Sequence, residues 1–453
     1  MKKISALLLS LCLLCGLAAS FGRETLAAGE TPEVRIGLES AFLNKDSITF
    51  NDRELSVGYE QGGVFWETGT FAAVSGFSVG CSGSEIVLYD GQSVAAVFDG
   101  NPQFFNASGS VTSIGGKKYR GRVELSQRGG KITAINVLSV EEYLYGSVPS
   151  EMPSSWNQEA LRAQAVAART YIYARTGVHS ASGYDLCDTN HCQVYLGYGN
   201  ESVAASAAVD ATAGIVATYN GQPITASFFA SSGGYTEDSE KVWVTAEPYL
   251  RAVPDTYETE GKIWSREYTL QDIERAVAAR NADIGAVTGV SISEASASGR
   301  VQELVITGAK GSLSLTKEEI RAFFAPLQGG MLESRNFTIA NGYVTTTPAQ
   351  AYVYDGKNTA NSGLAGLSVV SGSGAVSALP NQTLSVISAS GVTSVSPSAS
   401  VTSSNSNAIT LSGRGNGHGV GMSQYGAKGM AEAGFGFDEI LRYYYTGIEL
   451  GVR

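Results

Sequence analysis

The segment Ser139–Thr176 decides the fold, and it reads SVEEYLYGSVPSEMPSSWNQEALRAQAVAARTYIYART. Its first ten residues form a strand-like run. Glu151 follows between Pro149 and Pro153, and each proline fixes its own φ and pushes the preceding residue toward extended conformations. We therefore expect Glu151 to lie in a stiff loop, which can aim a carboxylate.

A helix is expected directly after this loop. Ser155 and Gln158 have the spacing of a capping box, which marks the start of a helix. Apolar residues then recur at the spacing of one helical face, at Leu161, Ala165, Ala168 and Ile172. The sequence predicts an alanine-rich amphipathic helix that packs closely against a sheet or another helix.

Length and charge limit the classes of protein to consider. With 453 residues the chain is long enough for two or three domains. The net charge is −11, and Lys117-Lys118 is the longest basic run, which argues against nucleic acid or an anionic membrane as the main partner. Sugars, peptides or small molecules are expected instead.

Residues 1–28 have the features of a secretory signal peptide. Lys2 and Lys3 precede an apolar run from Ile4 to Ala19, which is shorter than the roughly 20 residues that a membrane-spanning helix needs. We expect an exported protein, extracellular or associated with the cell wall. An uncleaved membrane anchor is the alternative.

The remaining chain predicts an α+β fold. Residues 29–115 form a β-rich region, because short apolar or alternating runs are separated by glycine-containing turns. Residues 116–340 and 406–453 form one mixed domain. Residues 341–405 form an insertion rich in serine, threonine and glycine, where alternation favours β structure and a flexible linker is the alternative.

Two glycine-rich segments could approach a ligand closely. The first is Ser231-Ser232-Gly233-Gly234, and the second is Arg414–Gly426, RGNGHGVGMSQYG, which contains His418. A backbone without large side chains can offer its N–H groups to a ligand, although a pair of glycines is also an ordinary turn.

Four residues have the chemistry of a metal site. His179, Cys187, His191 and Cys192 form a compact set of two cysteines and two histidines that could surround one zinc ion tetrahedrally. Their spacing is not that of a standard zinc finger. In an exported protein a Cys187–Cys192 disulfide is an alternative, as are free buried cysteines. Four protein ligands would leave no open position, so such a zinc would be structural.

Glu151 is the best candidate for a catalytic acid. Desolvation by Val148 and Met152 would raise the pKa of its carboxyl group, so that it could hold a proton near neutral pH. A solvated loop residue is the alternative. An ordinary glycosidase would need a second carboxylate, for which the candidates are Glu142, Asp210, Glu237 and Asp255.

Four segments resemble the SpoIID/LytB family of bacterial peptidoglycan proteins. They are Tyr143–Pro153, Glu159–Tyr171, Ser231–Gly234 with Trp243 beyond it, and Gly417–Gln424. The family includes lytic transglycosylases that act on glycan strands from which the stem peptides have been removed. The resemblance therefore implies a role in sporulation or in cell-wall metabolism.

The resemblance also implies roles for individual residues. Glu151 matches the catalytic acid/base, and Arg169 matches an arginine needed for activity. The metal set matches a zinc site found in some members. Substrate binding is expected from Gln164, Tyr171, Ser231, Ser232, Gly233, Gly234, Trp243, His418, Ser423 and Gln424.

A lytic transglycosylase needs no second carboxylate, because the 6-hydroxyl of the sugar replaces activated water. We therefore expect an enzyme that cleaves glycan strands between N-acetylmuramic acid and N-acetylglucosamine and leaves 1,6-anhydro ends. The alternative is a non-catalytic wall-binding protein that enhances an amidase. The expected partners are peptidoglycan glycan strands and an amidase, with no nucleic acid, and with a membrane only if the N-terminal segment stays uncleaved.

Overall fold

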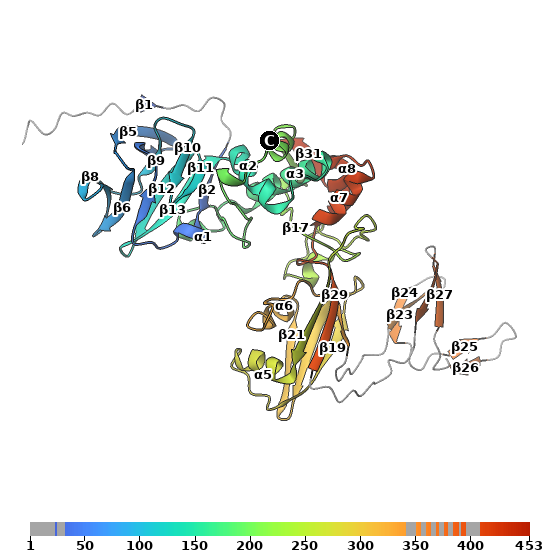
Figure 1. The fold of residues 1–453 in the computed structure, drawn as a ribbon. Helices are drawn as coiled ribbons and strands as arrows, with labels where there is room; N and C mark the ends of the chain where they lie inside the picture. The colour runs from blue at the N-terminus through green and yellow to red at the C-terminus, as the bar shows by residue number, and fades with distance from the viewer. Residues whose placement is uncertain are drawn as a thin grey trace, which may run out of the picture. The chain divides into compact units, whose positions relative to one another are not determined.

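A computed structural model describes residues 32–340 and 408–453 and, as backbone strands only, residues 23–24 and parts of 350–395. The expected signal peptide and most of the expected insertion lie outside the described residues. The fold is α+β and rich in strands, as the sequence predicts (Figure 1). Among the described residues, no helix is both long and apolar enough to cross a membrane.

The chain forms two compact units. Unit 1 contains Met1–Ala226, Phe435–Glu439 and Ile448–Arg453, and unit 2 contains Ser227–Gly434 and Ile440–Gly447. The division at Ala226 lies inside the mixed domain that we expected for residues 116–340. The two units are therefore described one at a time.

Unit 1 contains two large sheets. One has the strand order β1-β5-β4-β9-β12-β13-β2-β14, and the other has the order β11-β10-β3-β6-β7-β8. Their bounds are β1 (Arg23–Glu24), β2 (Glu33–Gly37), β3 (Ile48–Phe50), β4 (Glu54–Gln61), β5 (Val64–Ala72), β6 (Phe77–Ser82), β7 (Glu85–Asp90), β8 (Ser93–Phe98), β9 (Gln103–Asn106), β10 (Val111–Ile114), β11 (Lys117–Arg120), β12 (Arg122–Arg128), β13 (Lys131–Ser139) and β14 (Leu186–Cys187). Aromatic rings from both sheets meet in the core, where Phe104 lies 5.2 Å from Phe50 and 5.4 Å from Phe98.

The second part of unit 1 is helical. It contains α1 (Glu39–Phe42), α2 (Val140–Glu151), α3 (Gln158–Arg175), η1 (Ser180–Ser182), η2 (Tyr198–Asn200) and α4 (Val203–Asp210). A small sheet of β15 (Ile215–Tyr219), β16 (Gln222–Pro223) and β31 (Glu449–Val452) lies beside α3. The turn between β15 and β16 has positive φ at Asn220 and Gly221, as a two-residue hairpin turn requires.

The expected strand-like run before Glu151 is wrong, because Val140–Glu151 is helix α2. Ser139 and Glu142 form a capping box at its start, and Leu144 and Val148 are buried four residues apart on one face. The aromatic and β-branched residues that suggested a strand instead fill the buried side of a helix.

Glu151 does not lie in the expected loop, since it is the last residue of α2. Pro149 lies within the last turn, where it removes one backbone donor and crowds a carbonyl, and the helix ends two residues later. The Ser150 hydroxyl donates to the carbonyl of Gly146 at 2.6 Å. The stiffness that we expected from a loop is supplied by a helix end.

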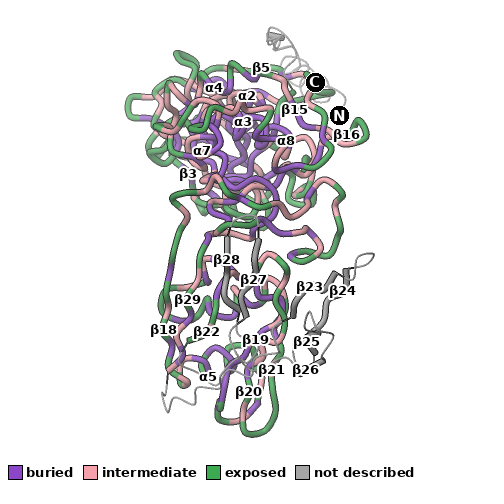
Figure 2. The backbone as a smooth tube through the Cα atoms, turned by 90° about the vertical axis from the view of Figure 1, so that its right-hand side faces the viewer, coloured by how far each residue is buried: buried purple, intermediate pink, exposed green. Residues whose placement is uncertain are grey.

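Helix α3 has the predicted buried face but a different start. Its N-cap is Asn157, whose side chain accepts a hydrogen bond from the backbone of Glu159, so the expected capping box from Ser155 is wrong. The four apolar residues predicted for one face are all buried. Figure 2 shows α3 as a largely buried helix within unit 1.

Unit 2 contains two three-stranded sheets, β18-β29-β22 and β19-β20-β21. The bounds in unit 2 are β17 (Phe228–Phe229), η3 (Ser239–Lys241), β18 (Ile263–Thr269), α5 (Leu270–Ala278), β19 (Val287–Ala295), β20 (Val301–Gly308), β21 (Gly311–Thr316), α6 (Glu319–Phe323), β22 (Phe337–Ala340), β29 (Ala408–Arg414), β30 (Met422–Ser423) and α7 (Gln424–Glu432). Helix α8 (Phe437–Tyr444) has residues in both units. Leu304, Phe323 and Leu411 are among the buried residues of one apolar core.

The expected insertion lies between two neighbouring strands of unit 2. Strand β22 ends at Ala340, which pairs with Thr410 of β29. The described strands between them are β23 (Gln350–Tyr354), β24 (Thr359–Gly363), β25 (Ser368–Val370), β26 (Val376–Ala378), β27 (Leu384–Ser388) and β28 (Gly391–Val395), which pair as consecutive antiparallel hairpins.

Candidate active site and metal centre

Glu151 lies half-buried at the carboxyl end of α2. Its Oε1 atom accepts a hydrogen bond of 2.8 Å from the backbone nitrogen of Val194. Val148 and Met152, near it in the sequence, are both buried. The hydrogen bond from Val194 therefore fixes the direction of the Glu151 carboxylate, which is close in sequence to two buried apolar residues.

The segment 193–204 packs along the turn that carries Glu151. The Asn200 amide donates to the Ser150 hydroxyl at 2.9 Å, on the residue before Glu151. Beyond Glu151, the hydroxyl of Ser202 donates to that of Ser154 at 2.7 Å. Together with the hydrogen bond from Val194 to Glu151, these contacts fix the acidic turn at three points.

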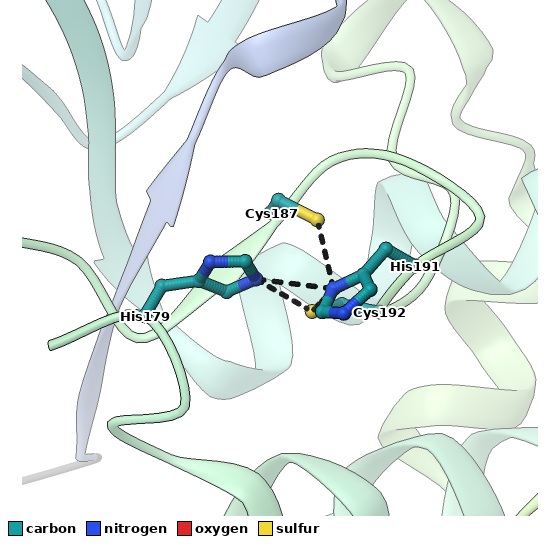
Figure 3. Close-up of side chains that lie close together, drawn as sticks. All are labelled: His179, Cys187, His191 and Cys192. Atoms are coloured by element: carbon teal, nitrogen blue, oxygen red, sulfur yellow. Dashed lines mark hydrogen bonds between the residues drawn. The ribbon is translucent and has the colours of Figure 1, made fainter. Parts of the chain in front are cut away.

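The four residues of the expected metal site converge on one point in unit 1 (Figure 3). His179 Nε2 lies 3.2 Å from His191 Nδ1 and 3.3 Å from Cys192 Sγ. His191 Nδ1 lies 3.4 Å from Cys192 Sγ and 3.8 Å from Cys187 Sγ. All four ligand atoms lie within 4.8 Å of one another.

These separations match the edges of a small tetrahedron. Zinc bonds of about 2.0–2.1 Å to nitrogen and about 2.3 Å to sulfur give edges of about 3.3 Å between nitrogens and about 3.5 Å between nitrogen and sulfur. Hydrogen bonding alone would not draw two thiols and two imidazoles to a common centre. The set therefore fits a tetrahedral metal ion.

The surrounding structure holds the ligands in place. Both cysteines are free thiols in the structure, and the hydrogen bond from Cys192 lowers the pKa of the Cys187 thiol to about 4. The Thr189 hydroxyl lies 3.2 Å from Cys187 Sγ, and the ring of His179 stacks on Tyr184 at 5.2 Å. A thiolate at Cys187 is the form that a metal binds.

Arg169 lies on α3 and pairs with the start of α2, not with Glu151 at its end. Its guanidinium is fully buried and pairs with both carboxylate oxygens of Glu141, at 2.8 and 2.6 Å. It also donates to the carbonyl of Ile215 at 3.1 Å. Glu141 lies in the first turn of α2 and Glu151 at its end, about 15 Å apart at helical rise. The structure thus brings Arg169 to Glu141, not to Glu151.

Gln164 and Tyr171, both expected to bind substrate, lie on α3. Gln164 is fully buried, and Tyr171 is half-buried. Burial raises the pKa of the Tyr171 hydroxyl, with a smaller contribution from the nearby Cys192. Gln164 is therefore part of the packing around α3, whereas Tyr171 is partly accessible.

In unit 2, the expected substrate-binding serines surround a carboxylate that the sequence did not single out. The hydroxyls of Ser231, Ser232 and Ser423, all buried, donate to Glu258. The backbone nitrogens of Ser232 and Gly233 also donate to it, at 2.6 and 3.2 Å. Glu258 lies in an irregular segment with no recognisable motif, so only the folded chain reveals this role.

His418 is also engaged within unit 2. Its Nε2–H donates to the carbonyl of Phe228, and its Nδ1 accepts from the backbone of Val420, both at 3.1 Å. Burial lowers its pKa to about 4, so the ring is neutral at neutral pH. Trp243 packs against it at 5.1 Å and remains 37% exposed, whereas Gln424 is buried. Of the expected binding residues in unit 2, Trp243 and Gly234 are exposed, whereas Gly233 and His418 are half-buried.

Asp255, one of the candidate second carboxylates, is buried in unit 2. It is 2% exposed and accepts a 2.9 Å hydrogen bond from Tyr444. It lies against Gly426, where a Cβ atom would come within 2.4 Å of its oxygens. Burial raises the pKa of its carboxyl group from 3.8 to about 6.

We expect Glu141→Ala to lower the free energy of unfolding of unit 1 by about 3–5 kcal/mol, because it leaves the buried Arg169 cation unpaired. Chemical denaturation followed by circular dichroism measures this loss. Glu142→Ala is the matched control, since it removes a helix cap and should cost about 1 kcal/mol. Equal small losses in both variants would contradict a structural role for the Glu141–Arg169 pair.

We expect the stability of unit 2 to fall by about 3 kcal/mol between pH 4 and pH 6 because of Asp255. Folded Asp255 keeps a proton up to about pH 6, whereas unfolded aspartate loses it near 3.8, so stability falls as pH rises. Denaturation of the wild type and of Asp255→Asn across this range tests the effect. An unchanged pH slope in Asp255→Asn would show that another group is responsible.

Comparison with known proteins agrees with the motifs. Residues 128–219 match the SpoIID family, described as "Stage II sporulation protein", and residues 256–358 match a domain of unknown function, DUF8618. The first match includes the segment from the end of β12 to β15, with Glu151 and the four metal-site residues. The second begins within unit 2.

Several relatives align over most of this chain. It is 33% identical to the amidase enhancer of Bacillus subtilis (strain 168) over 77% of this chain and 46% of that protein, so it spans about half the length of that relative. It is 29% identical to the stage II sporulation protein D of the same organism, over 70% of this chain and 76% of that protein. An uncharacterised protein of Brachyspira hyodysenteriae is 26% identical over 75% of this chain and 73% of its own length. Residues 128–219 of the chain therefore match the SpoIID family, and the chain is similar along most of its length to proteins named stage II sporulation protein D and amidase enhancer.

Proposed function

We propose that this chain is an exported lytic transglycosylase that cleaves peptidoglycan glycan strands, with Glu151 as its single acid/base. The observation that carries the proposal is the placement of Glu151, half-buried at the end of α2 and aimed by the backbone N–H of Val194. The relative named stage II sporulation protein D supports a role in sporulation or cell-wall metabolism.

Two opposing effects act on the Glu151 carboxyl group. The carboxyl end of a helix has a partial negative charge, which disfavours an ionised carboxylate there. The N–H of Val194 favours the ionised form. The proposed reaction uses this carboxyl group first as a proton donor and then as a proton acceptor.

The reaction has two steps. Glu151 first donates its proton to the glycosidic oxygen between N-acetylmuramic acid and N-acetylglucosamine, and the bond to the anomeric carbon breaks. The Glu151 carboxylate then removes the proton from the 6-hydroxyl of the muramic acid residue, whose oxygen bonds to the anomeric carbon. Glu151 is protonated again and no water is consumed, so no second carboxylate is needed.

We further propose that the metal site in unit 1 binds a structural zinc ion. Two thiols and two imidazoles at tetrahedral separations are a donor set typical of zinc, and they fill all four positions. The ligand Cys192 lies two residues before Val194, so a metal ion that fixes this segment would also fix the donor to Glu151.

The amidase enhancer relative favours a second function. That protein is the most identical of the relatives described above, and its name indicates that it stimulates an amidase. A wall-binding protein that recruits an amidase would need a glycan-binding surface but no acid at Glu151. The enzyme therefore requires the carboxyl group of Glu151, whereas the amidase enhancer does not.

We expect Glu151→Gln to lower the formation of 1,6-anhydro ends at least 1,000-fold, because the amide can neither donate nor accept the proton. The mature protein and its variants are incubated with peptide-free glycan strands and with intact peptidoglycan, and the products are measured by mass spectrometry. Glu85→Gln, at an exposed glutamate of unit 1, is the matched control and should retain full activity.

Two outcomes would reject the enzyme. One is the absence of anhydro product from both substrates with the wild type, and the other is equal activity of Glu151→Gln and wild type. Stimulation of an amidase that survives Glu151→Gln would then favour the second function.

We expect one zinc ion per chain in the purified protein, measured by elemental mass spectrometry. Cys187→Ser should lose most of this zinc and lower the melting temperature, because a structural metal contributes its binding energy to folding. Cys81→Ser is the matched control, since Cys81 is also a free cysteine but lies outside the metal set. A metal-free wild type with a single titratable thiol would indicate a Cys187–Cys192 disulfide instead.

A further inference from the structure

A second feature of unit 1 is a cluster built around Arg120, which the proposed chemistry does not use. The Arg120 guanidinium lies over the ring of Tyr198 at 5.1 Å and over that of Tyr145 at 5.5 Å. Glu201 accepts two hydrogen bonds from it, at 2.6 and 2.7 Å. The Tyr145 hydroxyl donates to Asp210 at 2.6 Å. Every charged group in the cluster thus has a partner.

The backbone that carries Tyr198 is closely packed. Gly197 has a φ of +74° and lies so near β11 that a Cβ atom would come within 2.6 Å of the Lys118 carbonyl. Gly146 of α2 lies against Tyr195 and the carbonyl of Gly197 in the same way. A ring mounted on this segment is therefore preorganised and loses little freedom when it binds a ligand.

Two apolar side chains of this segment remain exposed, Tyr198 at 38% and Leu196 at 48%. They lie between Val194, which donates to Glu151, and Asn200, which donates to Ser150. The exposed pair is therefore held beside the acidic turn by contacts on both sides. A glycan strand that extends from Glu151 along the segment 194–200 would reach these two side chains.

We propose that Tyr198, with Leu196, forms a sugar-stacking subsite for an N-acetylhexosamine ring of a glycan strand, next to the ring cleaved at Glu151. The axial C–H groups of a pyranose pack on an aromatic face, and tyrosine combines an apolar ring with a polar edge. Arg120 occupies one face of Tyr198, which leaves the other for the sugar. Because Glu201 neutralises Arg120, the subsite suits an uncharged sugar and not an anion.

This inference rests on the proposed function for the position of the glycan, so its test separates binding from catalysis. Binding of a chitin tetrasaccharide, a soluble N-acetylglucosamine oligomer, is measured by calorimetry in the Glu151→Gln background, where no cleavage occurs. We expect Tyr198→Ala to weaken binding about tenfold and Tyr198→Leu to weaken it similarly, whereas Tyr198→Phe keeps it within about twofold. Trp66→Ala, at another partly exposed aromatic residue of unit 1, is the matched control and should bind normally.

In the active protein, we expect Tyr198→Ala to raise KM for peptide-free strands about tenfold and to change kcat less than about twofold. Zinc content and circular dichroism of each variant establish that the metal segment is intact. Equal binding by Tyr198→Ala and its parent, or no binding of the oligosaccharide by the parent, would overturn the subsite. Failure of the proposed enzyme would show instead as absent anhydro product with binding retained.

Discussion

The buried ion pair between Arg169 and Glu141 is the interaction on which the helical part of unit 1 depends. Arg169 comes from the middle of α3, Glu141 from the start of α2, and the same guanidinium donates to a carbonyl of β15. A fully buried guanidinium is costly unless each of its donors has a partner, so these elements can assemble in few other ways. The direction of α2, and with it the position of Glu151, follows from this pairing.

This pairing also changes how a required arginine is understood. The family resemblance suggests that Arg169 is needed for activity. In the structure, Arg169 could support activity indirectly, because it pairs with Glu141 and so holds α2 in place. A residue at one end of a helix can govern a carboxylate at the other by fixing the helix axis. Loss of activity on substitution of such a residue does not show contact with substrate, so stability has to be measured beside activity.

The sequence predicted the strands of the β-rich region and the buried face of α3, because these depend on local periodicity and turn chemistry. It misassigned Val140–Val148, where strand-forming residues are held in a helix by a capping box and tertiary packing. The sequence also predicted that the four metal-site residues lie close together, because all four fall within 14 residues of the chain. Glu258 could not be predicted, because its serine partners lie 26 residues before it and 165 residues after it.

The position of residues 341–407 has a practical consequence. They enter and leave unit 2 between two strands that are already hydrogen-bonded neighbours, with Ala340 opposite Thr410. The ends of the segment are thus held close together by the sheet itself, and loop closure costs little more as such a segment grows. This makes the β22–β29 connection a natural attachment point for a fluorescent or affinity domain, which would report on the protein in living cells without touching either chain terminus.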